Sequence, residues 1–76
     1  MSMKCSERIR QVRESRNYSQ KDIARELHVS QRVYSDYERG RVRISVEALQ
    51  RLAFYYDLSM DYLSGSSDVE SCYPKN

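Results

Sequence analysis

The chain has 76 residues, two cysteines, one histidine and a formal net charge of +2 at pH 7, so it builds one small domain and no more. Cys5 and Cys72 lie near opposite ends and, with His28, provide too few ligands for a structural zinc site. No apolar run approaches the roughly 20 residues of a membrane span, and no secretory leader is recognisable, so we expect a cytoplasmic protein with reduced thiols.

The first part of the chain predicts two helices. One runs over about residues 4–15 and ends where Asn17 can adopt the left-handed cap conformation. The next is capped by Ser19, which forms a variant capping box with Asp22, and it reaches Leu27. Apolar residues at helical spacing are expected to be buried on these helices: Ile9, Val12, Ile23, Ala24 and Leu27.

Three more helices follow. Ser30 caps one that ends before Gly40, Ser45 caps the fourth, and Ser59 caps a short fifth turn. No segment suggests a strand, which predicts an all-α, compact five-helix domain over residues 1–65. Residues 66–76 lack a periodic pattern and are expected to be a flexible polar tail. The residues expected to face the core are Val46, Leu49, Leu52, Ala53, Tyr56, Met60 and Leu63.

The middle of this pattern predicts a helix-turn-helix. Residues 20–40 read QKDIARELHVSQRVYSDYERG, two short helices joined by a tight connector around Val29. Ala24 supplies the small side chain needed where the helices cross. His28 stands in the turn, where a positive φ angle costs a histidine on the order of 1 kcal/mol, and we expect it to face solvent rather than sense pH.

Seven short motifs occur in a characteristic order and spacing. They are Ile9-Arg10-x-Val12-Arg13, Ser19-Gln20, Ile23-Ala24, Val29-Ser30, Tyr37-Glu38-Arg39-Gly40, Leu49-x-x-Leu52-Ala53 and Leu58-Ser59-Met60-Asp61-x-Leu63. Together they resemble the phage-repressor/Cro (XRE) family of helix-turn-helix domains over residues 9–63. The resemblance implies a lambda-repressor-like fold that binds DNA. The chain departs from the family at His28, where glycine is usual, and at Ile44, where proline is frequent.

The third predicted helix carries the groups that read base edges in a major groove. Arg32 can donate two hydrogen bonds to guanine, and Gln31 can pair with adenine, each contributing roughly 1–3 kcal/mol of discrimination. Asp36 would be repelled by phosphates, so it accepts from cytosine, orients Arg32 or rejects wrong sites. The predicted base-reading residues are Gln31, Arg32, Val33, Ser35 and Asp36.

Phosphate contacts are expected around this helix. Residues 1–44 hold 11 Lys/Arg against 6 Asp/Glu, whereas residues 45–76 hold 2 against 5, so the half with the reading helix attracts DNA. Gln20 opens the second helix, and the resemblance implies that it clamps a phosphate and touches the reading helix. The predicted phosphate-binding residues are Gln20, Ser30, Arg41 and Arg43, with Lys21 and Arg39 as weaker candidates.

Other residues are expected to be structural. The resemblance implies a partly buried ion pair between Arg13 and Glu38, and Tyr34 and Tyr37 are assigned to the core more than to DNA. A homodimer is expected, because such regulators read two half-sites across a two-fold axis. The predicted dimer interface consists of Phe54, Tyr55, Leu58 and Tyr62; a rim of half-exposed aromatic residues that completes the monomer core is the alternative.

The sequence thus predicts a transcriptional regulator that binds a double-stranded DNA operator, more as a repressor than as an activator. RNA polymerase is a further candidate partner, because Asp22 and Glu26 lie on the second helix, although Lys21 and Arg25 dilute that acidic patch. An antitoxin or adaptor-type interaction module on the same fold stays open as the alternative. No catalytic arrangement, cofactor site or small-molecule site is evident, so we expect no enzyme.

Overall fold

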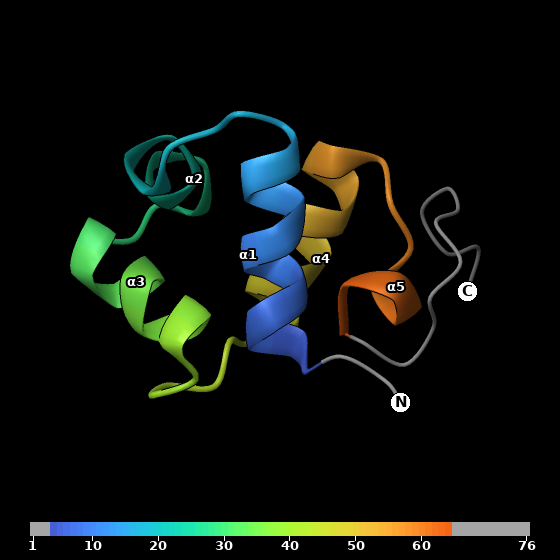
Figure 1. Ribbon diagram of the computed structural model, residues 1–76. Coiled ribbons are helices and arrows are strands. Elements are labelled where there is room, and N and C mark those ends of the chain that lie inside the picture. Colours follow the sequence, from blue (N-terminus) through green and yellow to red (C-terminus); the bar gives the residue numbers. More distant parts are fainter. Residues whose placement is uncertain (1–3, 65–76) are drawn as a thin grey trace.

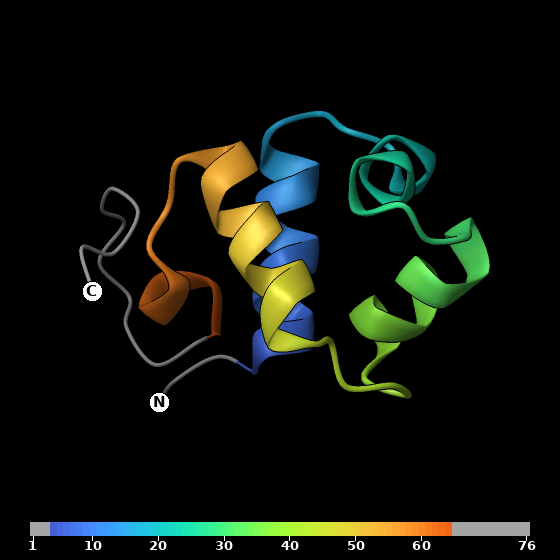
Figure 2. The same cartoon turned by 180° about the vertical axis from the view of Figure 1, so that it is seen from behind.

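The structure, a computed structural model, describes residues 4–64. Within this range all regular elements are helical, which confirms the predicted all-α fold. Helices α1 and α4 occupy the centre, one in front of the other, with α2 and α3 on one flank and α5 on the other (Figures 1 and 2). The helices are α1 (Cys5–Ser15), α2 (Gln20–Leu27), α3 (Gln31–Arg39), α4 (Val46–Tyr56) and α5 (Met60–Ser64).

The predicted helix starts are confirmed by their caps. The Ser19 hydroxyl accepts from the Asp22 backbone N–H at 3.0 Å, and the Asp22 carboxylate accepts from the Ser19 backbone N–H at 3.0 Å, which completes the capping box. Ser30, Ser45 and Ser59 each accept the backbone N–H three residues later, at 3.0–3.1 Å. Side chains therefore satisfy donors that each helix leaves unpaired.

The helix ends use the left-handed conformation. Asn17, His28 and Gly40 have φ angles of 62°, 60° and 74°, as their sequence positions predicted. Asp57, which was not predicted, closes α4 with φ 58°. These short turns bring the chain back onto itself within two or three residues and set the angles between successive helices.

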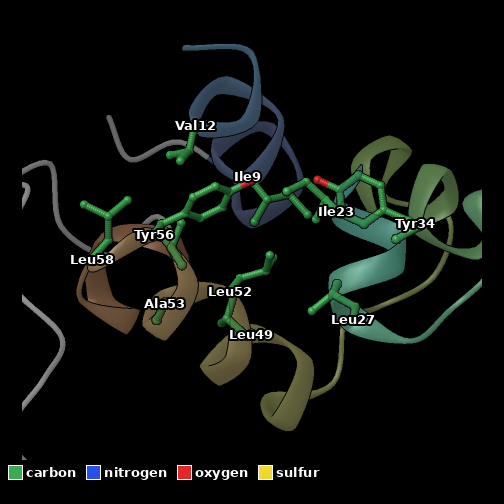
Figure 3. Close-up of a cluster of buried hydrophobic side chains, with 12 residues drawn as sticks. Ile9, Val12, Ile23, Leu27, Tyr34, Leu49, Leu52, Ala53, Tyr56 and Leu58 are labelled. Carbon is green, nitrogen blue, oxygen red and sulfur yellow. The ribbon is translucent and has the colours of Figure 1, made fainter. Parts of the chain in front are cut away.

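The core lies between the two flanks and is built from all five helices (Figure 3). Tyr34 of α3 and Tyr56 of α4 enter it from opposite sides, exposed by 0% and 2%. The prediction for Val46 was wrong, since 66% of it is exposed. Val46 is the first residue of α4, and its side chain lies outside the row of buried residues that begins at Leu49. The residues of this core are Ile9, Val12, Ile23, Ala24, Leu27, Tyr34, Leu49, Leu52, Ala53, Tyr56, Leu58 and Leu63.

Candidate nucleic-acid interface

Helices α2 and α3 pack on each other as the predicted helix-turn-helix. Ala24 is buried in the crossing, and its carbonyl oxygen accepts the Val29 backbone N–H at 3.0 Å. His28 sits at the bend in the left-handed conformation and is exposed. The turn is therefore held by backbone hydrogen bonds, and the side chains on the outer surface of α3 remain available to a ligand.

The predicted base-reading residues lie on one side of the first two turns of α3. Gln31, Arg32 and Val33 are exposed, and Ser35 and Asp36 are half-buried. Within residues 4–64, no hydrogen bond or ion pair joins Asp36 to Arg32. Of the roles considered for the Asp36 carboxylate, accepting from a base and rejecting wrong sites are compatible with this geometry, whereas orienting Arg32 finds no support in it.

Cationic and polar groups surround this surface. Arg39, Arg41, Arg43 and Lys21 are exposed, and the loop after α3 is held because the Asp36 carbonyl accepts the backbone N–H groups of residues 41 and 42, at 3.0 and 3.4 Å. The Ser30 hydroxyl is already engaged as the cap of α3. The arrangement places exposed guanidinium groups beside the C-terminal end of the reading helix.

Behind the surface, Glu38 gathers donors from three helices. Arg13 of α1 donates from Nε to Oε2 at 2.7 Å and from Nη2 to Oε1 at 3.2 Å, which confirms the expected ion pair. The Tyr34 hydroxyl donates to Oε2 at 2.5 Å. Gln20, at the start of α2, donates from Nε2 to Oε1 at 3.0 Å, so the expected contact of Gln20 with α3 is also confirmed.

This network fixes the charge states of its members. Burial of Glu38 would raise the pKa of its carboxyl group, but the hydrogen bonds from Arg13, Tyr34 and Gln20 outweigh burial and lower the pKa. The pKa of Tyr34 is raised, first by burial and then by its hydrogen bond to Glu38. At neutral pH the site thus contains an ionised carboxylate and a protonated phenol. The sequence did not indicate that Tyr34 or Gln20 would join the ion pair.

The predicted dimer-interface residues lie on α4, on α5 and in the loop between these helices. Phe54 is 77% exposed, while the Tyr55 ring packs against Tyr18 at 5.5 Å between centroids. Tyr62 lies on α5, where the Arg8 guanidinium stacks over its ring at 4.1 Å from the centroid. Tyr55 and Tyr62 are thus partly engaged by contacts within the monomer.

Leu58 is a correction to that prediction. It is 2% exposed and belongs to the monomer core, so it offers no surface to a partner. The cause is the end of α4: Asp57 takes the left-handed conformation, and the Leu58 backbone N–H bonds the Ala53 carbonyl at 2.9 Å. An apolar residue after such a turn characteristically folds back onto the helix it follows.

A buried arginine was missed altogether. Arg8 is 3% exposed and donates to the Tyr62 carbonyl at 3.1 Å, which fastens α5 to α1.

In the part of the chain that the structure describes, no group of three or more possible metal ligands occurs, and none of the helices has the length and apolar character of a membrane span. The predicted tail and Cys72 lie outside the described residues.

Comparison with known proteins agrees with this geometry. A family model described as helix-turn-helix matches residues 9–63. The chain is 44% identical over 64 residues to the HTH-type transcriptional regulator DdrOP3 of Deinococcus deserti, covering 83% of this chain and 50% of that protein. It is 31% identical over 67 residues to the HTH-type transcriptional regulator ImmR of Bacillus subtilis, covering 88% of this chain and 53% of that protein.

Among solved structures, a transcriptional regulator from Listeria innocua matches with a TM-score of 0.79 and 29% identity, over 86% of this chain and 61% of that one. The chain thus spans about half the length of the two sequence relatives. The match runs through α1 to α5 and includes the turn, the reading helix and the residues of the Glu38 network. The chain belongs to the phage-repressor/Cro-like helix-turn-helix family.

Proposed function

We propose that this chain is a sequence-specific double-stranded DNA-binding transcriptional regulator that reads an operator through α3 in the major groove. The observation that carries the proposal is the two-sided construction of α3. Its outer side exposes an amide and a guanidinium from Gln31 and Arg32, whereas its inner side is anchored by Tyr34 and Glu38. A rigidly held helix with a polar outer surface suits direct readout of base edges.

In this proposal the side chains divide into two groups. Arg32 reads guanine, Gln31 reads adenine, and Val33 contacts a thymine methyl group. Ser35 and Asp36 influence which base is preferred at the neighbouring positions of the operator. The phosphate contacts orient the domain on the duplex without reading sequence. They come from Gln20, the capping end around Ser30, Arg41 and Arg43, with Lys21 and Arg39 at the edge.

A homodimer is part of the proposal, because two reading helices about one helical turn apart bind an operator far more tightly than one. Phe54 is the leading interface candidate, since 77% of this large apolar side chain is exposed. Tyr55 and Tyr62 are secondary candidates, because each already packs within the monomer. Repression is the simplest mode of action, because a dimer bound to an operator that overlaps a promoter blocks RNA polymerase. A direct contact between α2 and RNA polymerase is a further part of the proposal.

The regulator is proposed to act in the cytoplasm and without catalysis. An antitoxin or adaptor role on the same fold is less favoured, because the two relatives in the comparison are named as transcriptional regulators. The proposal needs only DNA and a second copy of the chain.

The test is selection of bound duplexes from a randomised pool at about 150 mM salt, repeated with Arg32→Ala. We expect a palindrome with half-sites about 10 base pairs apart, and loss of one guanine preference in the variant. Arg51→Ala is the matched control, because Arg51 is an exposed arginine of α4 and is not among the proposed DNA-contacting residues. Absence of any enriched sequence, with only weak salt-sensitive binding, would refute the proposal.

A further inference from the structure

We propose that the Tyr34 hydroxyl is a positioning group for the Gln20 contact with DNA phosphate, and that it acts through the Glu38 carboxylate. This inference rests on the proposed DNA-binding function. Tyr34 itself cannot meet the duplex, because it is 0% exposed. Its effect must therefore pass through the residue it touches.

Each oxygen of the Glu38 carboxylate accepts two hydrogen bonds, and together these bonds fix the plane of the group. Oε2 accepts from Arg13 Nε at 2.7 Å and from the Tyr34 hydroxyl at 2.5 Å. Oε1 accepts from Arg13 Nη2 at 3.2 Å and from Gln20 Nε2 at 3.0 Å. Two donors on each oxygen leave the carboxylate a single orientation, and charge-assisted hydrogen bonds of this kind are stronger than neutral ones.

The orientation of Glu38 decides which end of the Gln20 amide faces inward. An ionised carboxylate only accepts hydrogen bonds, so the NH₂ end of the amide must point at it. One N–H of Nε2 is used by Glu38, and the second remains for another acceptor. A phosphate oxygen is also an acceptor only, so this second N–H is the group left for it, whereas an amide turned the other way would place its carbonyl oxygen against the Glu38 carboxylate and lose the hydrogen bond that holds it.

Tyr34 is the group that makes this orientation firm. It lies one helical turn before Glu38 on α3, and burial keeps its pKa raised, so it stays a hydroxyl donor at every physiological pH. Arg13 bonds both oxygens but is also drawn to the Tyr18 carbonyl by a bond of 2.8 Å. Without the Tyr34 hydroxyl, Oε2 keeps one donor, so the Arg13 guanidinium alone restrains the carboxylate, and the bond from Gln20 loosens.

Tyr56 provides a matched control for Tyr34. Both are buried tyrosines of the same core, exposed by 2% and 0%. Among the described residues, the Tyr56 hydroxyl is buried without a hydrogen-bond partner, whereas the Tyr34 hydroxyl bonds Glu38. A change to phenylalanine therefore removes one buried oxygen in each case, but it disturbs the Glu38 network only at Tyr34.

The experiment measures affinity for the selected duplex with Tyr34→Phe, Tyr56→Phe, Gln20→Ala and the double variant Gln20→Ala/Tyr34→Phe, at a temperature where circular dichroism shows each to be folded. We expect Tyr34→Phe to bind about fivefold to tenfold more weakly and Tyr56→Phe to stay within twofold of wild type. In the Gln20→Ala background, Tyr34→Phe should add less than a further twofold loss. The salt dependence should not change, because an amide releases no counterions.

The outcomes separate the inference from the function it rests on. If the wild type selects no duplex, both fail. If the wild type binds but Tyr34→Phe behaves like Tyr56→Phe, or its loss is fully retained in the Gln20→Ala background, the positioning role is overturned and the DNA-binding function stands.

Should Tyr34→Phe not fold, hydrogen exchange of the wild-type side-chain amides decides the matter. Gln20 Nε2 protons should be protected relative to those of Gln31, which is exposed. Equal exchange at the two residues overturns the proposal, because it would mean that Glu38 does not hold the Gln20 amide.

Discussion

Replacement of Arg13 by methionine should expose how strongly the Glu38 network supports the fold. The Arg13 and Glu38 side chains are only 12% and 2% exposed, so the change leaves a carboxylate in the interior without its cation. Such a loss costs 3–5 kcal/mol where burial is complete. We expect about 3 kcal/mol, because Tyr34 and Gln20 still donate to Glu38. That is a large share of the roughly 4–11 kcal/mol typical of a domain of this size.

The dependence of this cost on pH gives the sharper test. In the wild type the pKa of Glu38 is lowered, so its contribution is present above the ordinary carboxyl range and is lost as the pH falls through the folded-state pKa. Arg13 is the largest of the influences that lower the pKa of Glu38, so this pKa should rise when Arg13 is replaced. The cost of Arg13→Met should therefore shrink as the pH falls from 7 towards about 4.5, since protonation removes the stranded charge.

Urea denaturation followed by circular dichroism at several pH values measures both quantities. Arg10→Met is the control, because Arg10 forms an ion pair with Glu14 in which the side chains are 63% and 54% exposed. Pairs of this kind contribute less than about 1 kcal/mol. If Arg13→Met cost no more than Arg10→Met, or cost the same at pH 7 and pH 5, the reasoning about the buried carboxylate would be refuted.

Three further predictions concern single residues. Tyr56→Phe should leave the free energy of unfolding unchanged or raise it by up to about 1 kcal/mol, because the hydroxyl lost has no partner among the described residues; a clear loss in urea denaturation would contradict this. His28→Gly should stabilise the fold by up to about 1 kcal/mol, since glycine adopts φ 60° without strain; a lower melting temperature would count against it. If each subunit of a dimer neutralises about four phosphates, the slope of log K against log salt is about −7, and Arg43→Ala should reduce its magnitude by about 2, because each subunit loses one phosphate contact. An unchanged slope in a salt titration of duplex binding would remove Arg43 from the phosphate contacts.

The sequence was most informative where structure is decided locally. The serine caps, the positive φ angles at Asn17, His28 and Gly40 and the apolar stripes of the helices all follow from residues within one or two turns of each other. The helix-turn-helix was predictable for the same reason, since its two helices and their connector are contiguous. These features fixed the position of the reading helix before any tertiary contact was known.

The features that the sequence did not reveal lie where distant segments meet. The burial of Arg8 depends on Tyr62, 54 residues away, and no local pattern distinguishes it from Arg10, which is exposed on the same helix. The role of Tyr34 in the Glu38 network likewise needed the relative placement of three helices. Leu58 did carry a signal: a left-handed residue at Asp57 followed by an apolar residue predicts that the latter packs back onto α4.

The central claim is that α3, the start of α2 and the loop after α3 form the DNA-binding surface. Chemical-shift mapping of ¹⁵N-labelled protein with the selected duplex tests it most directly, because every backbone amide reports at once. We expect the largest shifts at Gln20, around Gln31 and Arg32, and at Arg41 and Arg43. Shifts confined to α4 and α5, with the first turn of α3 unchanged, would contradict the account.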